Sequence, residues 1–342
     1  CDLNHSLPDM CERVVFRVDC GRVWGLSYGH LRRAMILCRR LPSRFKPVFI
    51  MKDYPEGLAV ARREGLECIA LNRESDSEAE LLAVCERLRP GLMIFDLPTT
   101  PYREIFEWAR VHRARSVVFD FAGRCSGRPD IVINDSLVAA SIAYPQLTSE
   151  TRLALGPAYF ILDSPPLAAP PRRQIERAMI TLGGSDPADL TPKIVAALLQ
   201  LGPIARLEVV LGPIYPGREN IETLAAHAPW VTVLNAPPDF LERLADQDLV
   251  ITAGGRTLYE CAVLGRPVIV APTIEHEAAA AEAFAMHTGA VNLGLWSDDA
   301  SPDKLRRTFS YYCAAAAYRT CLLYTSDAAD DLLCVDLGGR RI

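Results

Sequence analysis

Short apolar segments alternate with amphipathic stretches along most of the chain, and this alternation constrains the fold more than any other feature. In the first half, strands are predicted at 14–18, 48–51, 67–71, 92–95, 116–120 and 131–134. Residues 30–41 and 77–89 carry apolar side chains three and four positions apart, which predicts helices. Strands that alternate with helices are typical of parallel βαβ units, in which ligands bind beyond the carboxyl ends of the strands.

The same alternation returns after a proline-rich segment. Strands are predicted at 178–184, 207–212, 231–234, 248–255 and 266–272, and helices at 192–201 and 256–265. Between the two sets, residues 162–177 hold four prolines and no sustained periodicity, which indicates a linker. We therefore predict an α/β protein with two Rossmann-like domains and a small-molecule site in the cleft between them.

The predicted domains follow from these segments. Residues 1–162 form an N-terminal sugar-binding and catalytic domain, 163–177 the linker, and 178–319 a C-terminal nucleotide-binding domain. From about Thr320 the βα alternation stops, and residues 320–342 resemble a translated sequencing adapter, so they are excluded from the fold prediction. The chain begins with Cys1 instead of Met, which indicates a missing start.

Composition excludes several function classes. The chain has 342 residues, half of them hydrophobic, and a net charge of −5 without a basic stripe, so nucleic acid is not an expected partner. No apolar run reaches the ~18 residues of a membrane span, and we expect a cytoplasmic monomer. The eleven cysteines include no C-x-x-C pair and no histidine at metal-ligand spacing, so neither metal nor cofactor is predicted.

Two glycine turns follow predicted strands in the second half. In 182–190, Gly183, Gly184 and Ser185 would let a ligand approach the backbone, and Ser185, Asp186 and Pro187 would begin a helix whose N–H groups suit phosphate. An ordinary tight turn explains the same pattern.

The second glycine turn lies in 251–270. Gly254 and Gly255 precede a helix that would face a diphosphate, and Glu260 would accept hydrogen bonds from ribose hydroxyls. The alternative for Glu260 is a solvated helix position.

A third turn, GLSYGHLRR at 25–33, raises the question of a catalytic histidine. His30 follows Gly29 and is a candidate general base, because a neutral imidazole is abundant at physiological pH; a helix-capping histidine is the alternative. Asp19 would orient His30, contact the sugar or cap the turn. Arg17 would line the cleft floor, and Arg33 would hold the diphosphate or reach solvent.

Together, LGGSDP, AGGRTLYECAVLGRP and RVDCG followed by SYGHLRR resemble the UDP-sugar hydrolase of the pseudaminic acid pathway, a relative of the lipid II glycosyltransferase and other GT-B enzymes. The resemblance covers about residues 14–305. It implies the GT-B fold, with parallel sheets that face each other across a cleft. It also implies that Gly254, Gly255 and Glu260 bind UDP, and that His30 activates water for inverting attack on the anomeric carbon.

The sequence departs from this family at three places. Ser27 stands where a glycine is usual, Asp96 is followed by Leu97 instead of an aromatic turn, and Glu275-His276-Glu277 replaces an Asn-Gln pair. Asp96 and His276 remain candidate substrate-binding residues. An acidic pair beside a diphosphate is unfavourable unless one side chain points away.

Three functions therefore remain. The first is hydrolysis of a UDP-(diacetamido-trideoxy)hexose with release of UDP. The second is a GT-B glycosyltransferase that uses a UDP-sugar donor in cell-surface polysaccharide synthesis. The third is a non-catalytic nucleotide-sugar binder.

Overall fold

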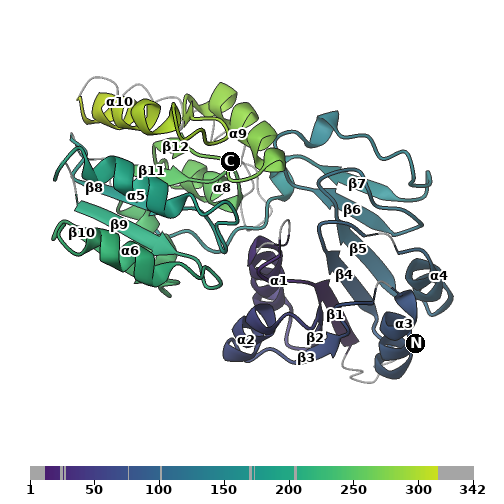
Figure 1. Cartoon of the computed structure of the whole chain (residues 1–342). Coiled ribbons are helices and arrows are strands. Elements are labelled where there is room, and N and C mark those ends of the chain that lie inside the picture. The colour runs from purple at the N-terminus through teal and green to yellow at the C-terminus, as the bar shows by residue number, and fades with distance from the viewer. Residues whose placement is uncertain are drawn as a thin grey trace, which may run out of the picture. The chain divides into compact units, whose positions relative to one another are not determined.

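The computed structural model describes residues 12–314 except 24, 25, 27, 76, 101, 169–171, 173, 204 and 205. The positions Gly25 and Ser27 and the predicted tail 320–342 therefore lie outside the described residues. The chain divides into two compact units (Figure 1). Unit 1 contains the described residues of Cys1–Gly21, His30–Asp135 and Ala139–Leu155; unit 2 contains those of Arg22–Gly29, Ser136–Val138 and Gly156–Ile342. The domain boundaries drawn from the sequence stay a prediction.

Unit 1 is built on a seven-stranded parallel sheet in the order β3-β2-β1-β4-β5-β6-β7. The strands are β1 (Glu12–Val18), β2 (Phe45–Lys52), β3 (Cys68–Leu71), β4 (Leu92–Asp96), β5 (Arg115–Phe119), β6 (Ile131–Asn134) and β7 (Arg152–Leu155). The six predicted strands of this half are confirmed. The sequence did not predict β7, because its exposed edge position leaves it short and only partly apolar.

Four α-helices connect the first strands of unit 1: α1 (Tyr28–Arg40), α2 (Pro55–Arg63), α3 (Glu78–Leu88) and α4 (Glu104–Val111). Short 3₁₀ turns lie at Ala139–Ser141 and, in unit 2, at Pro157–Tyr159. One face of the sheet packs against α3 and α4, where Val15, Met93, Phe95 and Val118 meet Leu81 and other helix side chains. On β1, Phe16 stacks on Phe49 of β2. The predicted helices at 30–41 and 77–89 are confirmed as α1 and α3.

Unit 2 is a six-stranded parallel sheet in the order β10-β9-β8-β11-β12-β13. The strands are β8 (Arg177–Thr181), β9 (Arg206–Leu211), β10 (Val231–Asn235), β11 (Leu249–Thr252), β12 (Val268–Val270) and β13 (Val291–Asn292). The helices are α5 (Thr191–Leu199), α6 (Arg218–Ala225), α7 (Phe240–Ala245), α8 (Arg256–Val263), α9 (Glu275–Thr288) and α10 (Ser301–Cys313). All five predicted strands and both predicted helices of this half are confirmed.

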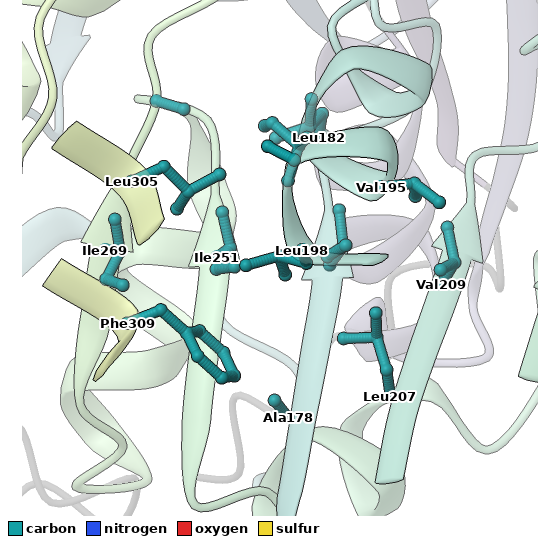
Figure 2. Close-up of a cluster of buried hydrophobic side chains, with 14 of the residues drawn as sticks. Ala178, Leu182, Val195, Leu198, Leu207, Val209, Ile251, Ile269, Leu305 and Phe309 are labelled. Carbon is teal, nitrogen blue, oxygen red and sulfur yellow. The ribbon is translucent and has the colours of Figure 1, made fainter. Parts of the chain in front are cut away.

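Both faces of the second sheet are buried, which explains why its central strands β8, β11 and β12 are mostly apolar. On β11, Ile251 points into a cluster with α5 and α10, where Figure 2 shows it beside Leu198, Leu305 and Phe309. The neighbouring Val250 belongs to a second cluster with α7, α8 and α9. Successive side chains of a strand point to opposite faces, so β11 contributes to a core on each side of the sheet.

Each sheet has one point where the connections change direction. The strand order places it between β1 and β4 in unit 1, and between β8 and β11 in unit 2. Ligands of open α/β sheets bind at the carboxyl ends of the strands beside such a point. Among the described residues, no helix has the length and apolar character needed to cross a membrane.

Candidate active site

His30 and Asp96 meet at the switch point of the first sheet. His30 lies in the first turn of α1, which follows β1, and Asp96 is the last residue of β4. The Nδ1 atom of His30 lies 2.7 Å from Oδ1 of Asp96. The side chain of His30 is 13% exposed and that of Asp96 only 2%. A carboxylate at Nδ1 holds that nitrogen protonated, so Nε2 is the nitrogen that can accept a proton.

Arg33, one helical turn after His30, binds the same carboxylate. Its Nε donates to Oδ2 of Asp96 at 2.7 Å and its Nη2 to Oδ1 at 2.8 Å. Its Nη1 donates to Oδ2 of Asp135, the residue directly after β6, at 3.3 Å. Burial by itself would raise the pKa of Asp96, but the positive charge of Arg33, followed by His30, holds that pKa well below its usual range.

Two aromatic rings enclose the Arg33 guanidinium. Its central carbon lies 4.4 Å from the ring centre of Phe119 and 4.6 Å from that of Phe121. Burial would lower the pKa of Arg33, but Asp96 and Asp135 raise it. The residue is 4% exposed. Arg33 therefore does not reach solvent, and its donors bind two buried carboxylates; its contact with a diphosphate stays a prediction.

Arg17 and Asp19 form a separate buried pair at the end of β1. Nη1 and Nη2 of Arg17 donate to the two carboxylate oxygens of Asp19 at 2.6 and 2.8 Å. Asp19 also accepts the backbone N–H of Lys52 at 2.6 Å, which ties β1 to the end of β2. The expectation that Asp19 orients His30 is therefore corrected, as is the placement of Arg17 on an open cleft floor: Arg17 is 1% exposed.

Asp135 is a site residue that the sequence reasoning missed. It follows the buried strand segment IVIN, just as Asp19 follows β1 and Asp120 follows β5. An aspartate directly after a buried parallel strand was the available signal. The signal is not specific, since Asp120 only accepts the backbone N–H groups of Ala122 and Cys125 and so shapes its own turn.

The first glycine turn of unit 2 lies beside the switch point, after β8. Gly183 has a φ of +83°, a left-handed conformation that favours glycine. A Cβ on Gly212, after β9, would lie 2.3 Å from the carbonyl oxygens of Gly183 and Gly184, so these two turns pack backbone against backbone. Gly183 is therefore favoured by its backbone conformation and Gly212 by this close approach, whether or not a ligand binds there.

The predicted helix start at Ser185 is wrong, because α5 begins at Thr191. The intervening loop carries Asp186, whose carboxylate accepts the N–H groups of Leu190 and Thr191 at 3.0 and 2.7 Å and the Thr191 hydroxyl at 2.7 Å. Burial raises the pKa of Asp186. The free N–H groups expected for phosphate at this helix start are thus occupied by a side chain.

The second glycine turn leads from β11 into α8. Gly255 is the residue that precedes the helix, and a glycine supplies no side chain to cap the first N–H groups. Glu260, on α8, is 2% exposed, so its alternative as a solvated helix residue is wrong. Leu258, Ala262 and Leu264 are buried as well.

Glu277 of α9 packs against this turn. A Cβ on Gly254 would lie 2.4 Å from the backbone oxygen of Glu277, so only glycine fits there without movement. Oε2 of Glu277 accepts the N–H and hydroxyl of Thr273, each at 2.8 Å. Oε1 faces Gly255, 3.6 Å from the position of an added Cβ. The preceding residues Glu275 and His276 are exposed.

Metal-binding groups are absent from the described part of the chain, where no three His, Cys, Asp or Glu side chains are arranged to hold an ion. Cys20, the residue directly after Asp19, is buried, and burial raises the pKa of its thiol to about 12. A thiol with such a pKa is not a nucleophile at neutral pH.

Comparison with known proteins gives two kinds of similarity. No protein-family model matches the chain. It is 28% identical over 274 residues to the spore coat polysaccharide biosynthesis protein SpsG of Bacillus subtilis, covering 78% of this chain and 80% of SpsG. It is 24% identical over 265 residues to the uncharacterized protein MJ1062 of Methanocaldococcus jannaschii, covering 72% of this chain but only 53% of that protein.

Solved structures share the fold at low sequence identity. Acinetobacter baumannii MurG has a TM-score of 0.59 at 14% identity, with 92% of this chain and 95% of MurG covered. The spinosyn rhamnosyltransferase SpnG in complex with spinosyn aglycone has a TM-score of 0.63 at 13% identity, with 93% and 96% covered. With two parallel Rossmann-like sheets and these neighbours, the chain has the GT-B fold.

Proposed function

We propose that the protein is a glycosyltransferase that moves a sugar from a UDP-sugar donor to a hydroxyl acceptor during the synthesis of a cell-surface polysaccharide. The observation that carries the proposal is the His30–Asp96 pair at the carboxyl edge of the first sheet. The pair supplies a base with a defined free nitrogen, which is what an inverting transfer to a hydroxyl requires.

In the proposed reaction, His30 and Asp96 each have one role. Nε2 of His30 takes the proton of the acceptor hydroxyl while its oxygen attacks the anomeric carbon. The bond between that carbon and the diphosphate oxygen breaks with its electrons on the diphosphate, and the configuration inverts. Asp96 stabilises the imidazolium that forms. Because UDP is a good leaving group, the chemistry does not need a strong general acid.

Unit 2 supplies the nucleotide site in this proposal. The turn Gly254-Gly255 opens α8, whose first N–H groups and helix dipole favour the negative charge of a leaving diphosphate. Glu260 is assigned to the ribose, and Gly183, Gly184, Ser185 and His276 to the surrounding contacts. One structural neighbour, SpnG, is described as a complex with thymidine diphosphate (TM-score 0.60, 13% identity), which supports a pyrimidine nucleoside diphosphate as the class of leaving group.

The assignment to polysaccharide synthesis rests on a relative. SpsG, at 28% identity, is named a spore coat polysaccharide biosynthesis protein. The names of SpnG and of further neighbours describe sugar transfer. Both favour a transferase over the hydrolase that the sequence resemblance implied.

Hydrolysis remains the second candidate, because the residues Gly29, His30 and Arg33 carry the resemblance to the UDP-sugar hydrolase. The same base would then take a proton from water. The substrate in that case is a UDP-diacetamido-trideoxyhexose.

One experiment separates these functions. The full chain is incubated with UDP-N-acetylglucosamine, UDP-glucose and a UDP-diacetamido-trideoxyhexose, with and without a panel of simple glycosides, and UDP and sugars are measured by mass spectrometry. Turnover that needs a glycoside and yields a lengthened glycoside supports the transferase. Free sugar and UDP without acceptor support the hydrolase. Tight UDP binding without turnover on any donor contradicts both enzymes and leaves the non-catalytic binder.

A further inference from the structure

We propose that Arg33, held by Asp135, is a positioning residue that limits how strongly Asp96 stabilises the protonated form of His30. The inference deepens the proposed function, because it concerns the base of that reaction. It rests on one geometric fact: the carboxylate that orients His30 is the same carboxylate that Arg33 binds through two nitrogens.

The first step is orientation. A carboxylate in contact with only one imidazole nitrogen can rotate about its terminal torsion. Here Oδ1 of Asp96 is shared by His30 and Nη2 of Arg33, and Oδ2 is bound by Nε of Arg33. The guanidinium edge therefore fixes the plane of the carboxylate. Phe119 and Phe121 restrict the guanidinium in turn, at 4.4 and 4.6 Å.

The second step is charge. A carboxylate alone at 2.7 Å would favour the imidazolium and so remove the free base. The positive charge of Arg33 offsets that of Asp96 and weakens this effect. Asp135 acts in the opposite direction, because its carboxylate, 3.3 Å from Nη1, offsets part of the Arg33 charge. Asp96, Arg33 and Asp135 thus form a row of alternating charges beside His30, and in this proposal the row determines how strongly His30 holds a proton.

In the described part of the chain, the neighbouring elements carry few charged groups at this site. From β4 the group is Asp96, and from the end of β6 it is Asp135. Phe119 of β5 is uncharged. At the end of β1, Arg17 and Asp19 form an ion pair with each other. Beside His30 on α1, Arg32 is half-buried and adds a positive charge to the same helix turn.

The row of charges predicts shifts of opposite sign in two variants. In Arg33→Gln, Asp96 loses its counter-charge, so the midpoint of His30 protonation rises by about one to three pH units. In Asp135→Asn, Arg33 is offset less, so the midpoint falls. Arg33→Lys keeps the charge without the two-pronged contact and shifts the midpoint less than Arg33→Gln. If Arg33 and Asp135 only stabilised the fold, their replacement would not shift the midpoint of His30 protonation in opposite directions.

The test uses the full chain and does not depend on a known substrate. Imidazole signals are followed by heteronuclear NMR across pH, and the His30 signal is assigned from its loss in His30→Gln. Arg17→Gln serves as the matched control, since it also breaks a buried Arg–Asp pair, and its His30 midpoint is expected to stay unchanged. Circular dichroism establishes that each variant is folded.

The outcomes decide the inference by themselves. A rise in Arg33→Gln together with a fall in Asp135→Asn supports it. An unchanged midpoint in folded Arg33→Gln, or shifts of the same sign in both variants, overturns it. If Arg33→Gln does not fold, Asp135→Asn and Arg33→Lys decide, and an unchanged or raised midpoint in Asp135→Asn overturns the inference.

Activity provides a second readout once a donor is known. The acidic limb of the kcat profile in Arg33→Gln should move to higher pH than in the native protein. If the native protein turns over no donor while the NMR midpoints shift as expected, the proposed function fails and the charge relationship stands. If donors turn over but the midpoints do not move, the inference fails and the proposed function stands.

Discussion

Oδ1 of Asp96 lies 2.7 Å from Nδ1 of His30, although 66 positions separate the two residues in the chain. The pair occupies the carboxyl edge of the first sheet, beside the point where β1 and β4 diverge. The contact gives the histidine a defined tautomer. His30 belongs to α1, a helix that buries Leu31, Ala34 and Ile36 in the core of the unit. A base held by a rigid element and a buried carboxylate is suited to repeated proton transfer.

Replacing the base should remove turnover and spare nucleotide binding. In His30→Ala, kcat is expected to fall by about 10²–10⁴, the usual contribution of a general base. Affinity for UDP, measured by calorimetry, is expected to stay unchanged, because the residues assigned to UDP belong to unit 2. Unaltered turnover in this variant would contradict the assignment of His30.

Asp96 should make stability depend on acid pH. The pKa of Asp96 is lower in the folded chain than in the unfolded chain, where it is about 3.9. Its ionised form therefore contributes stability that is fully present above the unfolded pKa. This contribution declines as pH falls below that value and is gone once pH has fallen through the lower folded pKa. Compared with Asp96→Asn, the native protein should lose more free energy of unfolding between pH 6 and pH 3, as measured in urea.

The matched control for this measurement is Asp53→Asn. Asp53 also follows a strand, β2, but it is exposed. Its replacement should leave the acid dependence of the free energy of unfolding as it is in the native protein. Equal curves for the native protein and Asp96→Asn would show that the Arg33–Asp96 pair does not stabilise the folded state.

The two glycines before α8 should respond differently to alanine. In Gly254→Ala the new Cβ meets the backbone of Glu277 at 2.4 Å, so α9 must shift and thermal stability should fall by several degrees. In Gly255→Ala the nearest atom is 3.6 Å away, so the fold should tolerate the change.

The affinity for UDP is a second measurement on the alanine variants of these two glycines. The methyl group of Gly255→Ala stands at the turn assigned to the diphosphate, so UDP should bind at least several-fold more weakly without a loss of melting temperature. Native affinity in Gly255→Ala would place the diphosphate elsewhere.

Glu277 should weaken the binding of a diphosphate. Its Oε2 accepts two hydrogen bonds from Thr273, whereas Oε1 faces Gly255. In Glu277→Gln the amide oxygen can still accept from Thr273, while the negative charge beside the turn is removed. We expect UDP to bind several-fold more tightly, with a smaller gain at high salt because ions screen the charge. The exposed Glu275→Gln is the control, with a smaller effect.

The sequence predicted the strands of both sheets because their signal is local. Runs such as 249–251 and 268–270 are apolar along their whole length, which a strand buried on both faces demands. It erred where a glycine turn follows a strand. The run at 178–184 stops at Thr181, because Gly183 takes a left-handed φ and ends the extended backbone, and the run at 248–255 stops at Thr252, before Gly254 and Gly255. The edge strand β7 lacked that signal.

The sequence by itself determined that parallel βα units occur twice and that glycine turns and His30 follow strands. The tertiary structure alone decided the partner of His30. Local distance favours Asp19, but side chains two positions apart on a strand share a face, so Asp19 pairs with Arg17. The strand order brings the end of β4 beside β1, and so delivers Asp96 to His30 and, through Arg33, recruits Asp135 from β6. Such pairings depend on strand order, which no local period in the sequence encodes.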